Sequence, residues 1–169
     1  MPAWCRTRDA IRRAILAHGF DDGVGAFTQS FGSSVVDASA LMVPIVGFLP
    51  GNDPRVRSTI RAVMTRLRDE GGFVRRYEDG SDGLEGREGA FVMCTFWLAH
   101  SLALAGELDE ATEVFTAAKG AANDLGLMAE EIDATSGALL GNVPQAFSHV
   151  GLATAAHAIA HASSQANAR

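Results

Sequence analysis

The chain has 169 residues, 47% of them hydrophobic, and its mean hydropathy of +0.10 leaves enough apolar material for one domain with a packed core. A net charge of −6 and a pI of about 5.3 argue against nucleic acid and anionic membranes as partners, because such binding depends on clustered lysines and arginines. No stretch has the roughly 18 to 20 apolar residues of a membrane span, and no basic leader precedes an apolar block. We therefore expect a cytoplasmic protein that accepts a neutral polar ligand.

Two apolar segments are expected in the first third of the chain. Apolar residues recur at helical spacing over residues 7–18, and Gly19 ends this predicted helix. A loop containing several glycines and aspartates follows over residues 20–31. The next apolar segment, 35–48, contains Pro44, which predicts a kink or an early stop of its helix.

An arginine-rich helix and a long loop are expected next. Asp53 and Pro54 are an N-cap and a first-turn proline for a helix over residues 55–68, whose arginines are expected to form a solvated face. Residues 71–89 are polar and rich in glycine. A loop of this length in a compact domain is usually functional or disordered.

Three helices are expected in the second half. Residues 90–104 are apolar nearly all round, which predicts a buried helix containing a reduced, buried Cys94. Residues 107–125 predict an ordinary amphipathic helix, and residues 144–162 an alanine-rich one. The polar tail 163–169 is expected to be frayed.

An acidic loop precedes the last helix. Glu130 and Glu131 are adjacent, so on any regular element they point in different directions, and at most one is expected to face a cleft. The residues from Asp133 to Gly137 have the composition of a turn, and Pro144 suits the first turn of a helix. This arrangement places a carboxylate at the mouth of a helix.

Glycine-led loops at Gly32, Gly86 and Gly141 each open a largely apolar helix, at intervals of about 54 residues. An amphipathic helix lies between successive openings. Apolar inner helices alternating with amphipathic outer ones are typical of a helical toroid, with the loops before the inner helices at one end. About three such hairpins predict an all-α fold, an open half-ring with an exposed flank.

Three motifs in order resemble the C-terminal part of bacterial glycoside hydrolase family 15: GAFTQSFGSSVVDASALMVPIVGFLPGNDPRV, DGLEGREGAFVMCTFWLAHSLALAGELDEA and GLMAEEIDATSGALLGNVPQAFSHVGL. This family contains glucoamylases, glucodextranases and a trehalase group. The resemblance implies a partial (α/α)6 toroid over residues 1–169, without a metal or organic cofactor. It also implies inverting hydrolysis of α-glucosidic bonds by two carboxyl groups, an acid and a base.

Matched to the family's motif, Glu130 falls at the general-base position, and Glu131 is expected to be solvated or structural. The family's general acid lies in an earlier segment, and nothing before Trp4 supplies it. The family's N-terminal β-sandwich domain and the first half of its toroid are also missing. We therefore expect a truncated gene, a separately encoded half or an excised fragment, inactive alone.

Other candidates to bind substrate come from the same motifs. Arg76 and Tyr77 resemble a sugar-binding segment of the family, because a guanidinium donates paired hydrogen bonds to hydroxyls. The alternative for Arg76 is an ion pair with Glu78 or Asp79. Glu88 either faces the cleft or favours the start of a helix electrostatically.

Aromatic and polar side chains on the predicted inner helices complete the candidates. Trp97 is expected in the core rather than as a stacking platform for sugars. Gln145 and His149, one turn apart, are expected to line the floor of the pocket. His157 and His161 also lie one turn apart, but no third ligand accompanies them, so no metal site is expected.

The sequence leaves three hypotheses for function open. The first is a family 15 glycosidase for trehalose or short α-glucans, active when a complementary N-terminal chain supplies the acid. The second is a non-catalytic carbohydrate-binding or structural half-toroid. The third is a helical interaction protein that self-associates through its open edge. A carboxylate at the cleft end argues against the third.

Overall fold

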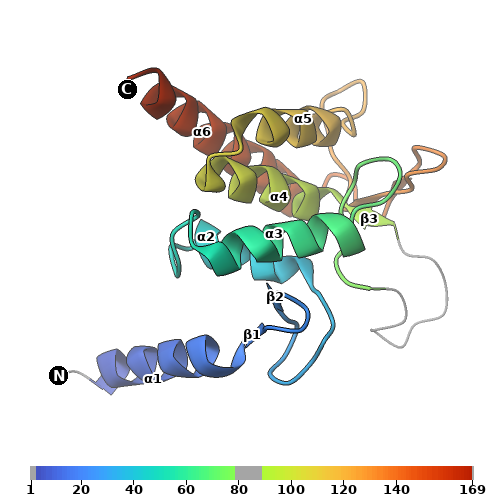
Figure 1. Ribbon diagram of the computed structural model, residues 1–169. Helices are drawn as coiled ribbons and strands as arrows, with labels where there is room; N and C mark the ends of the chain where they lie inside the picture. Colours follow the sequence, from blue (N-terminus) through green and yellow to red (C-terminus); the bar gives the residue numbers. More distant parts are fainter. Residues whose placement is uncertain (1–2, 79–88, 169) are drawn as a thin grey trace.

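Helices dominate the computed structural model, which describes residues 3–78 and 89–168 (Figure 1). The described strands are short and form antiparallel pairs: β1 (Phe20–Asp21) with β2 (Ala26–Phe27), and β4 (Glu131–Ile132) with both β3 (Ala90–Phe91) and β5 (Leu139–Leu140). No helix of the described part is long and apolar enough to cross a membrane. The helices are α1 (Ala3–His18), the 3₁₀ helix η1 (Ala38–Leu41), α2 (Met42–Ile45), α3 (Pro54–Arg66), α4 (Val92–Ala105), α5 (Leu108–Lys119) and α6 (Ala146–Asn167).

Helix α4 forms the centre of the core. Its side chains are apolar nearly all round, and Phe96, Leu98 and Leu102 have no solvent-exposed surface. Helices α5 and α6 pack against it on one side, and η1, α2 and α3 on the other (Figure 1). Each fully buried side chain of this size contributes about 1.5–3 kcal/mol to folding. The predicted buried helix is confirmed, and Gly106, at φ +84°, ends it.

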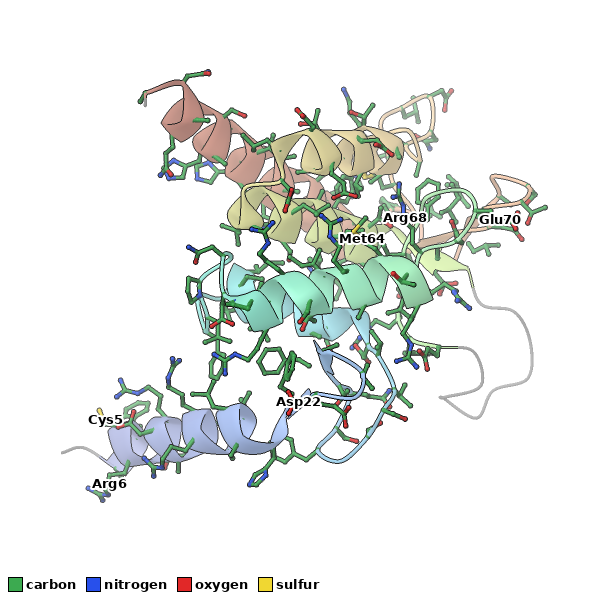
Figure 2. All side chains as sticks on the ribbon, viewed as in Figure 1. Cys5, Arg6, Asp22, Met64, Arg68 and Glu70 are labelled. Atoms are coloured by element: carbon green, nitrogen blue, oxygen red, sulfur yellow. The ribbon has the colours of Figure 1, made fainter. Side chains whose placement is uncertain are left out.

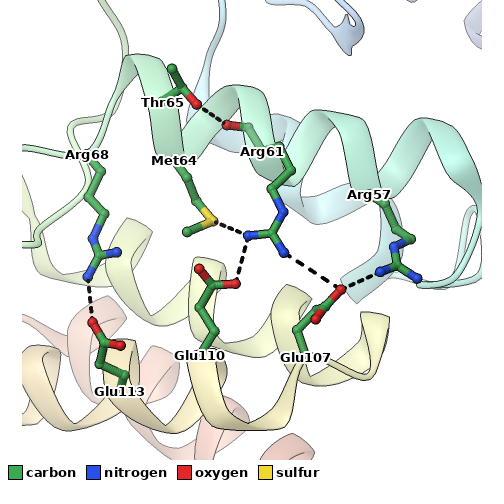
Figure 3. A network of polar contacts seen from close by, with 8 residues as sticks. All are labelled: Arg57, Arg61, Met64, Thr65, Arg68, Glu107, Glu110 and Glu113. Carbon is green, nitrogen blue, oxygen red and sulfur yellow. Dashed lines mark hydrogen bonds and ion pairs between the residues drawn. The ribbon is translucent and has the colours of Figure 1, made fainter.

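Helices α3 and α5 lie side by side and are joined by a row of ion pairs (Figure 3). Arg61 contacts Glu110 over 2.8 Å and Glu107 over 3.7 Å, and Arg57 also pairs with Glu107. A further pair, between Arg68 and Glu113, measures 3.4 Å. The predicted solvated face is confirmed for Arg57 and Arg61, which are exposed, and the ion pairs with α5 are an addition that the sequence did not predict. The side chains of Arg57 and Arg61 are about half exposed, whereas that of Arg68 is 23% exposed.

The predicted start of α3 is confirmed. The carboxylate of Asp53 accepts the backbone N–H of Arg55 over 2.9 Å, and Pro54 occupies the first helical position. The side chain of Arg55 also donates to this carboxylate, and these bonds to the charged form lower the pKa of Asp53. An N-cap residue of this kind contributes about 1 kcal/mol to a helix.

The helix predicted over residues 35–48 is much shorter in the structure. Residues 33–36 are not helical, and Asp37 caps η1 by accepting the N–H of Ser39 over 2.7 Å. The β-branched pair before Asp37 favours extended backbone, and the cap fixes the helix start after it. Helix α2 ends at Ile45, directly after Pro44, so the expected early stop is confirmed.

Two boundaries in the second half differ from those predicted. Helix α5 ends at Lys119 rather than near Leu125, because Gly120 follows it and the side chain of Asn123 builds a turn by accepting the N–H groups of Leu125 and Leu127. Helix α6 continues to Asn167, through the tail that was expected to be frayed. Side-chain bonds within its last turns support this extension, from Ser164 to the carbonyl of Ala160 and between Gln165 and His161.

The segments before η1, α4 and α6 meet at one end of the helical body, on the right in Figure 1. The N–H of Ala38 bonds to the carbonyl of Arg76 over 2.8 Å, and the N–H of Phe91 bonds to the carbonyl of Val74 over 3.0 Å. The N–H of Val92, the first residue of α4, bonds to the carbonyl of Glu130 over 3.1 Å. Within the described residues, these bonds bring the segments before η1, α4 and α6 together at one end.

Two helices present apolar side chains to solvent. Helix α1 has no buried residue, and Trp4 is 82% exposed. Helix α6 buries one face on α4 and α5, while Phe147 and Val150 on its other face are 65% and 58% exposed. Residues 146–167 contain no Asp, Glu, Lys or Arg. A long helix without charged residues is typical of one buried on most of its surface.

Candidate functional site

Two helix starts and a hairpin hold the backbone of Glu130. Its carbonyl accepts the N–H of Val92 at the start of α4, and its own N–H donates to the carbonyl of Asn142 over 2.9 Å. Just before it, the hydroxyl of Ser148 on α6 donates to the buried carbonyl of Ala129 over 2.7 Å. Backbone that is fixed on both sides can place a side chain accurately. Glu130 therefore lies between the starts of α4 and α6.

The carboxylate of Glu130 is bound by one neighbouring residue. The side-chain amide of Asn142 donates to Oε2 over 3.0 Å, and the backbone N–H of Asn142 donates to the same oxygen over 3.2 Å. The side chain passes over Gly141, where an added Cβ would lie 2.8 Å from Oε2. Glu130 is only partly buried, and its carboxylate is held by these two donors.

Glu131 and the hairpin turn have structural contacts. Oε2 of Glu131 accepts the N–H of Gly89 over 3.0 Å, which ties β4 to the chain just before β3. The predicted turn is confirmed, because Oδ1 of Asp133 accepts the N–H groups of Thr135 and Ser136, and Gly137 has φ +72°. The adjacent carboxylates of Glu130 and Glu131 thus have different partners.

Arg76 lies at the same end of the helical body but pairs within the fold. Its guanidinium contacts the carboxylate of Asp37, which is almost fully buried. Of the two alternative partners predicted for Arg76, Glu78 pairs with Arg66 over 2.6 Å, and Asp79 lies outside the described residues. Tyr77 is half-buried and forms a β-bridge with Asp37.

Asp37 is a residue that the sequence reasoning missed as a site candidate. Its carboxylate accepts the N–H of Ser39 and pairs with the guanidinium of Arg76. These two contacts offset the free-energy cost of burying a charged carboxylate. The signal for it was present, because an aspartate directly before an apolar helix is a typical N-cap. What the sequence lacks is any sign of its partner, 39 residues later in the chain.

The remaining candidates lie on α4 and α6 or outside the described part. Trp97 is half-buried and packs against the core, as expected. Gln145 is the N-cap of α6, and its carbonyl lies 2.8 Å from Nδ1 of His149. Neither residue lines the cavity described below, so their place on a pocket floor stays a prediction. Pro144 precedes the helix rather than standing in its first turn. Glu88 lies outside the described residues.

Burial makes Cys94 a poor nucleophile. It lies on α4 with no solvent exposure, is not part of a disulfide, and has a pKa raised to about 12 by burial, which the charge of Arg76 opposes. A thiol is reactive only as its thiolate. Among the described residues no group of three His, Cys, Asp or Glu side chains is placed to hold a metal ion, and His157 and His161 stack against each other.

An open cavity of about 760 Å³ lies beside the hairpin, where the segment after α3 meets the segment before β3. Arg68 and Glu70, labelled in Figure 2, belong to its wall. The other wall residues include Asp69, Arg75 and Asp133. Two of these wall side chains form hydrogen bonds within the fold: Arg68 donates to the carbonyl of Gly72, and Asp69 accepts the N–H of Phe73. Glu130 does not line this cavity.

Proteins of known function resemble the chain over most of its length. A trehalase of Thermoplasma volcanium is 42% identical over 149 residues, which make up 88% of this chain and 24% of that protein. A trehalase of Mycobacterium tuberculosis is 41% identical over 165 residues, which make up 97% of this chain and 24% of that protein. The chain therefore spans about a quarter of the length of these relatives.

Solved structures share the fold. A wild-type glycosidase matches with a TM-score of 0.76 and 24% identity, over 92% of this chain and 44% of its own. A glycosidase in complex with glucose matches with a TM-score of 0.75 and 24% identity, over the same shares. These likenesses confirm the predicted fold class, all-α and related to the (α/α)6 barrel. The family model described as "Glycosyl hydrolases family 15" matches residues 1–157, and the chain belongs to this family.

Proposed function

We propose that this chain is the general-base part of an inverting glycosidase that cleaves α-glucosidic bonds, with trehalose as its first candidate substrate. Membership of the family and the trehalase names of the relatives support a carbohydrate substrate. The observation that carries the proposal is that Glu130, only partly buried, has its carboxylate held by two donors at the end where α4 and α6 begin.

In this proposal Glu130 takes a proton from a water molecule. The oxygen of that water attacks the anomeric carbon while the bond to the leaving sugar oxygen breaks. A carboxylic acid on the opposite face gives its proton to that leaving oxygen, and the two carboxyl groups stand roughly 6.5 to 9.5 Å apart to leave room for the water. Arg76, Tyr77, Gln145 and His149 are the proposed sugar contacts, together with Glu88.

The general acid and the other half of the ring come, in this proposal, from the remainder of a longer parent chain or from a complementary polypeptide. The uncharged outer face of α6 and the unburied helix α1 are the surfaces that it covers. We accordingly expect the isolated chain to hydrolyse trehalose, maltose and isomaltose negligibly, because loss of the acid costs about two to four orders of magnitude in rate.

The test is a chimera in which this chain replaces the matching segment of the Mycobacterium tuberculosis trehalase. We expect glucose release from trehalose, and we expect Glu130→Gln to lower the rate by about two to four orders of magnitude. Glu131→Gln, which changes the adjacent carboxylate, is the matched control and keeps most of the activity. The anomer formed first, followed by NMR, reports inversion. Equal rates for the parent chimera and Glu130→Gln would remove Glu130 from the mechanism.

A non-catalytic carbohydrate-binding half-toroid is the second candidate, because Glu130 does not line the open cavity beside the hairpin. It predicts that the isolated chain binds glucose or trehalose and that the chimera is inactive. NMR titration of the isolated chain with each sugar tests for binding. Binding together with an inactive chimera supports the second candidate, and an active chimera supports the first.

A further inference from the structure

We infer that Asn142 is the positioning residue of Glu130, and that it holds one carboxylate oxygen so that the other faces the attacking water. The catalytic meaning of this inference rests on the proposed function. The contact itself does not, and it can be measured in the isolated chain.

Both donors of Asn142 point at the same oxygen. Its side-chain amide and its backbone N–H lie 3.0 Å and 3.2 Å from Oε2 of Glu130. Within residues 3–78 and 89–168, no donor to Oε1 accompanies them. A carboxylate fixed through one oxygen cannot rotate freely, so the direction of the second oxygen is also fixed. Hydrogen bonds to a charged acceptor are the stronger kind, which suits an anchor.

The backbone brings Asn142 to this place through an irregular hairpin. Glu131 pairs with Leu140 in the ladder, which would set Glu130 opposite Gly141, yet the N–H of Glu130 bonds to the carbonyl of Asn142. Gly141 and Asn142 together thus oppose Glu130, with Gly141 in the left-handed region at φ +70°, as in a β-bulge. Bulges of this kind redirect side chains next to functional sites.

Gly141 makes room for the carboxylate. An added Cβ at this position would lie 2.8 Å from Oε2 and 2.9 Å from the Cβ of Glu130. Only a residue without a side chain lets Glu130 lie across the bulge and reach both donors of Asn142. The two residues therefore act together: Gly141 leaves space for the side chain of Glu130, and Asn142 binds its Oε2.

In the reaction, this arrangement sets which oxygen receives the proton. The proton of the water passes to Oε1, and the bonds from Asn142 to Oε2 stay in place throughout the step. A base that points away from the water by about 1 Å loses roughly 100-fold in rate, so loss of the anchor is expected to act on kcat. Substrate contacts are unchanged, and KM is expected to move little.

The first experiment uses the isolated, ¹⁵N-labelled chain and the side-chain amide resonances of its asparagines. We expect Glu130→Gln to shift the Asn142 amide resonance, because a carboxylate is a stronger acceptor than a neutral amide. Glu131→Gln is expected to leave it in place. The side chain of Asn123, which caps a separate turn, is the internal reference. If the chemical shift of the Asn142 side-chain amide is the same in the parent chain and in Glu130→Gln, the inference is overturned.

The second experiment places Asn142→Ala in the trehalase chimera. We expect kcat to fall roughly 10- to 100-fold with KM nearly constant, and Asn142→Ser, which keeps a donor, to recover part of the loss. Asn123→Ala is the control: it removes an asparagine whose side chain also makes two hydrogen bonds to the fold, and kcat is expected to stay unchanged. An unchanged kcat in Asn142→Ala would overturn the inference. An inactive parent chimera would instead count against the proposed function, and the resonance of Asn142 would still decide whether it holds Glu130.

Discussion

Ser148 on α6 donates its hydroxyl to the carbonyl of Ala129 over 2.7 Å, and both residues are fully buried. This bond joins the last helix to the residue directly before Glu130. Without it, the carbonyl of Ala129 would be buried and unpaired.

We expect Ser148→Ala to lower the free energy of unfolding by about 1–3 kcal/mol, the cost of a buried acceptor left without a donor. Urea denaturation measures this value. Ser164→Ala is the control, since Ser164 makes a similar bond to a helix carbonyl in an exposed position and is expected to change stability by less than about 0.5 kcal/mol. Equal losses in both variants would contradict the role given to the buried bond.

Substituting two glycines of the β4–β5 hairpin distinguishes the cost of backbone strain from the cost of a steric clash. Gly137 and Gly141 have φ +72° and +70°, but an added Cβ at Gly137 meets nothing within 4 Å, whereas one at Gly141 meets Glu130. We expect Gly137→Ala to cost about 1–2 kcal/mol, the penalty of the left-handed conformation. Gly141→Ala is expected to cost more, because swinging the carboxylate away does not relieve the contact with the Cβ of Glu130. Denaturation of both variants gives the difference, and equal costs would contradict it.

Burial patterns made part of this fold predictable from the sequence. The all-round apolar pattern of residues 90–104 predicts the central helix α4, and Asp53 with Pro54 predicts the start of α3. Helix α6 is longer than the sequence predicts, because Ser164 and Gln165 in the polar tail form side-chain hydrogen bonds within the helix. Local pattern therefore gave the existence of the long helices more reliably than their ends.

Contacts between distant residues were not predictable in the same way. The partner of Arg76 is Asp37, from another segment, and the partners of the α3 arginines lie on α5. Nothing in the local sequence specifies which charged side chains will meet after folding. The contact between Asn142 and Glu130 could not be predicted either, because the bulge that brings the two residues together depends on the register of a short hairpin.

The ion pairs between α3 and α5 predict a salt-dependent stability. We expect Arg61→Ala to lower the free energy of unfolding by about 0.5–1 kcal/mol at low ionic strength, since Arg61 contacts both Glu107 and Glu110 but is half exposed. The loss is expected to shrink in about 1 M salt, where the Debye length is about 3 Å. Thr112→Ala on α5 is the control that removes no charge. A loss that is the same at both salt concentrations would show that Arg61 acts through packing.

His100 on α4 predicts a loss of stability toward acidic pH. Its ring is partly buried, with Nδ1 out of contact with solvent and without a hydrogen-bond partner among the described residues. Burial first, and then the nearby His157 on α6, lower the pKa of His100 below its usual 6.5. Because the unfolded chain binds this proton at a higher pH than the folded one, the unfolded state gains stability as the pH falls below about 6.5. Above that value both states are neutral at this position and the effect vanishes.

His100→Gln removes this titration, so the variant is expected to lose less stability than the parent chain between pH 7.5 and pH 5. The measurement is urea denaturation at several pH values, compared as the difference between parent and variant. His161→Gln, an exposed histidine on α6 for which no such burial applies, is the control. A parent and a His100→Gln variant whose stabilities fall in parallel across this range would show that another group carries the acid sensitivity.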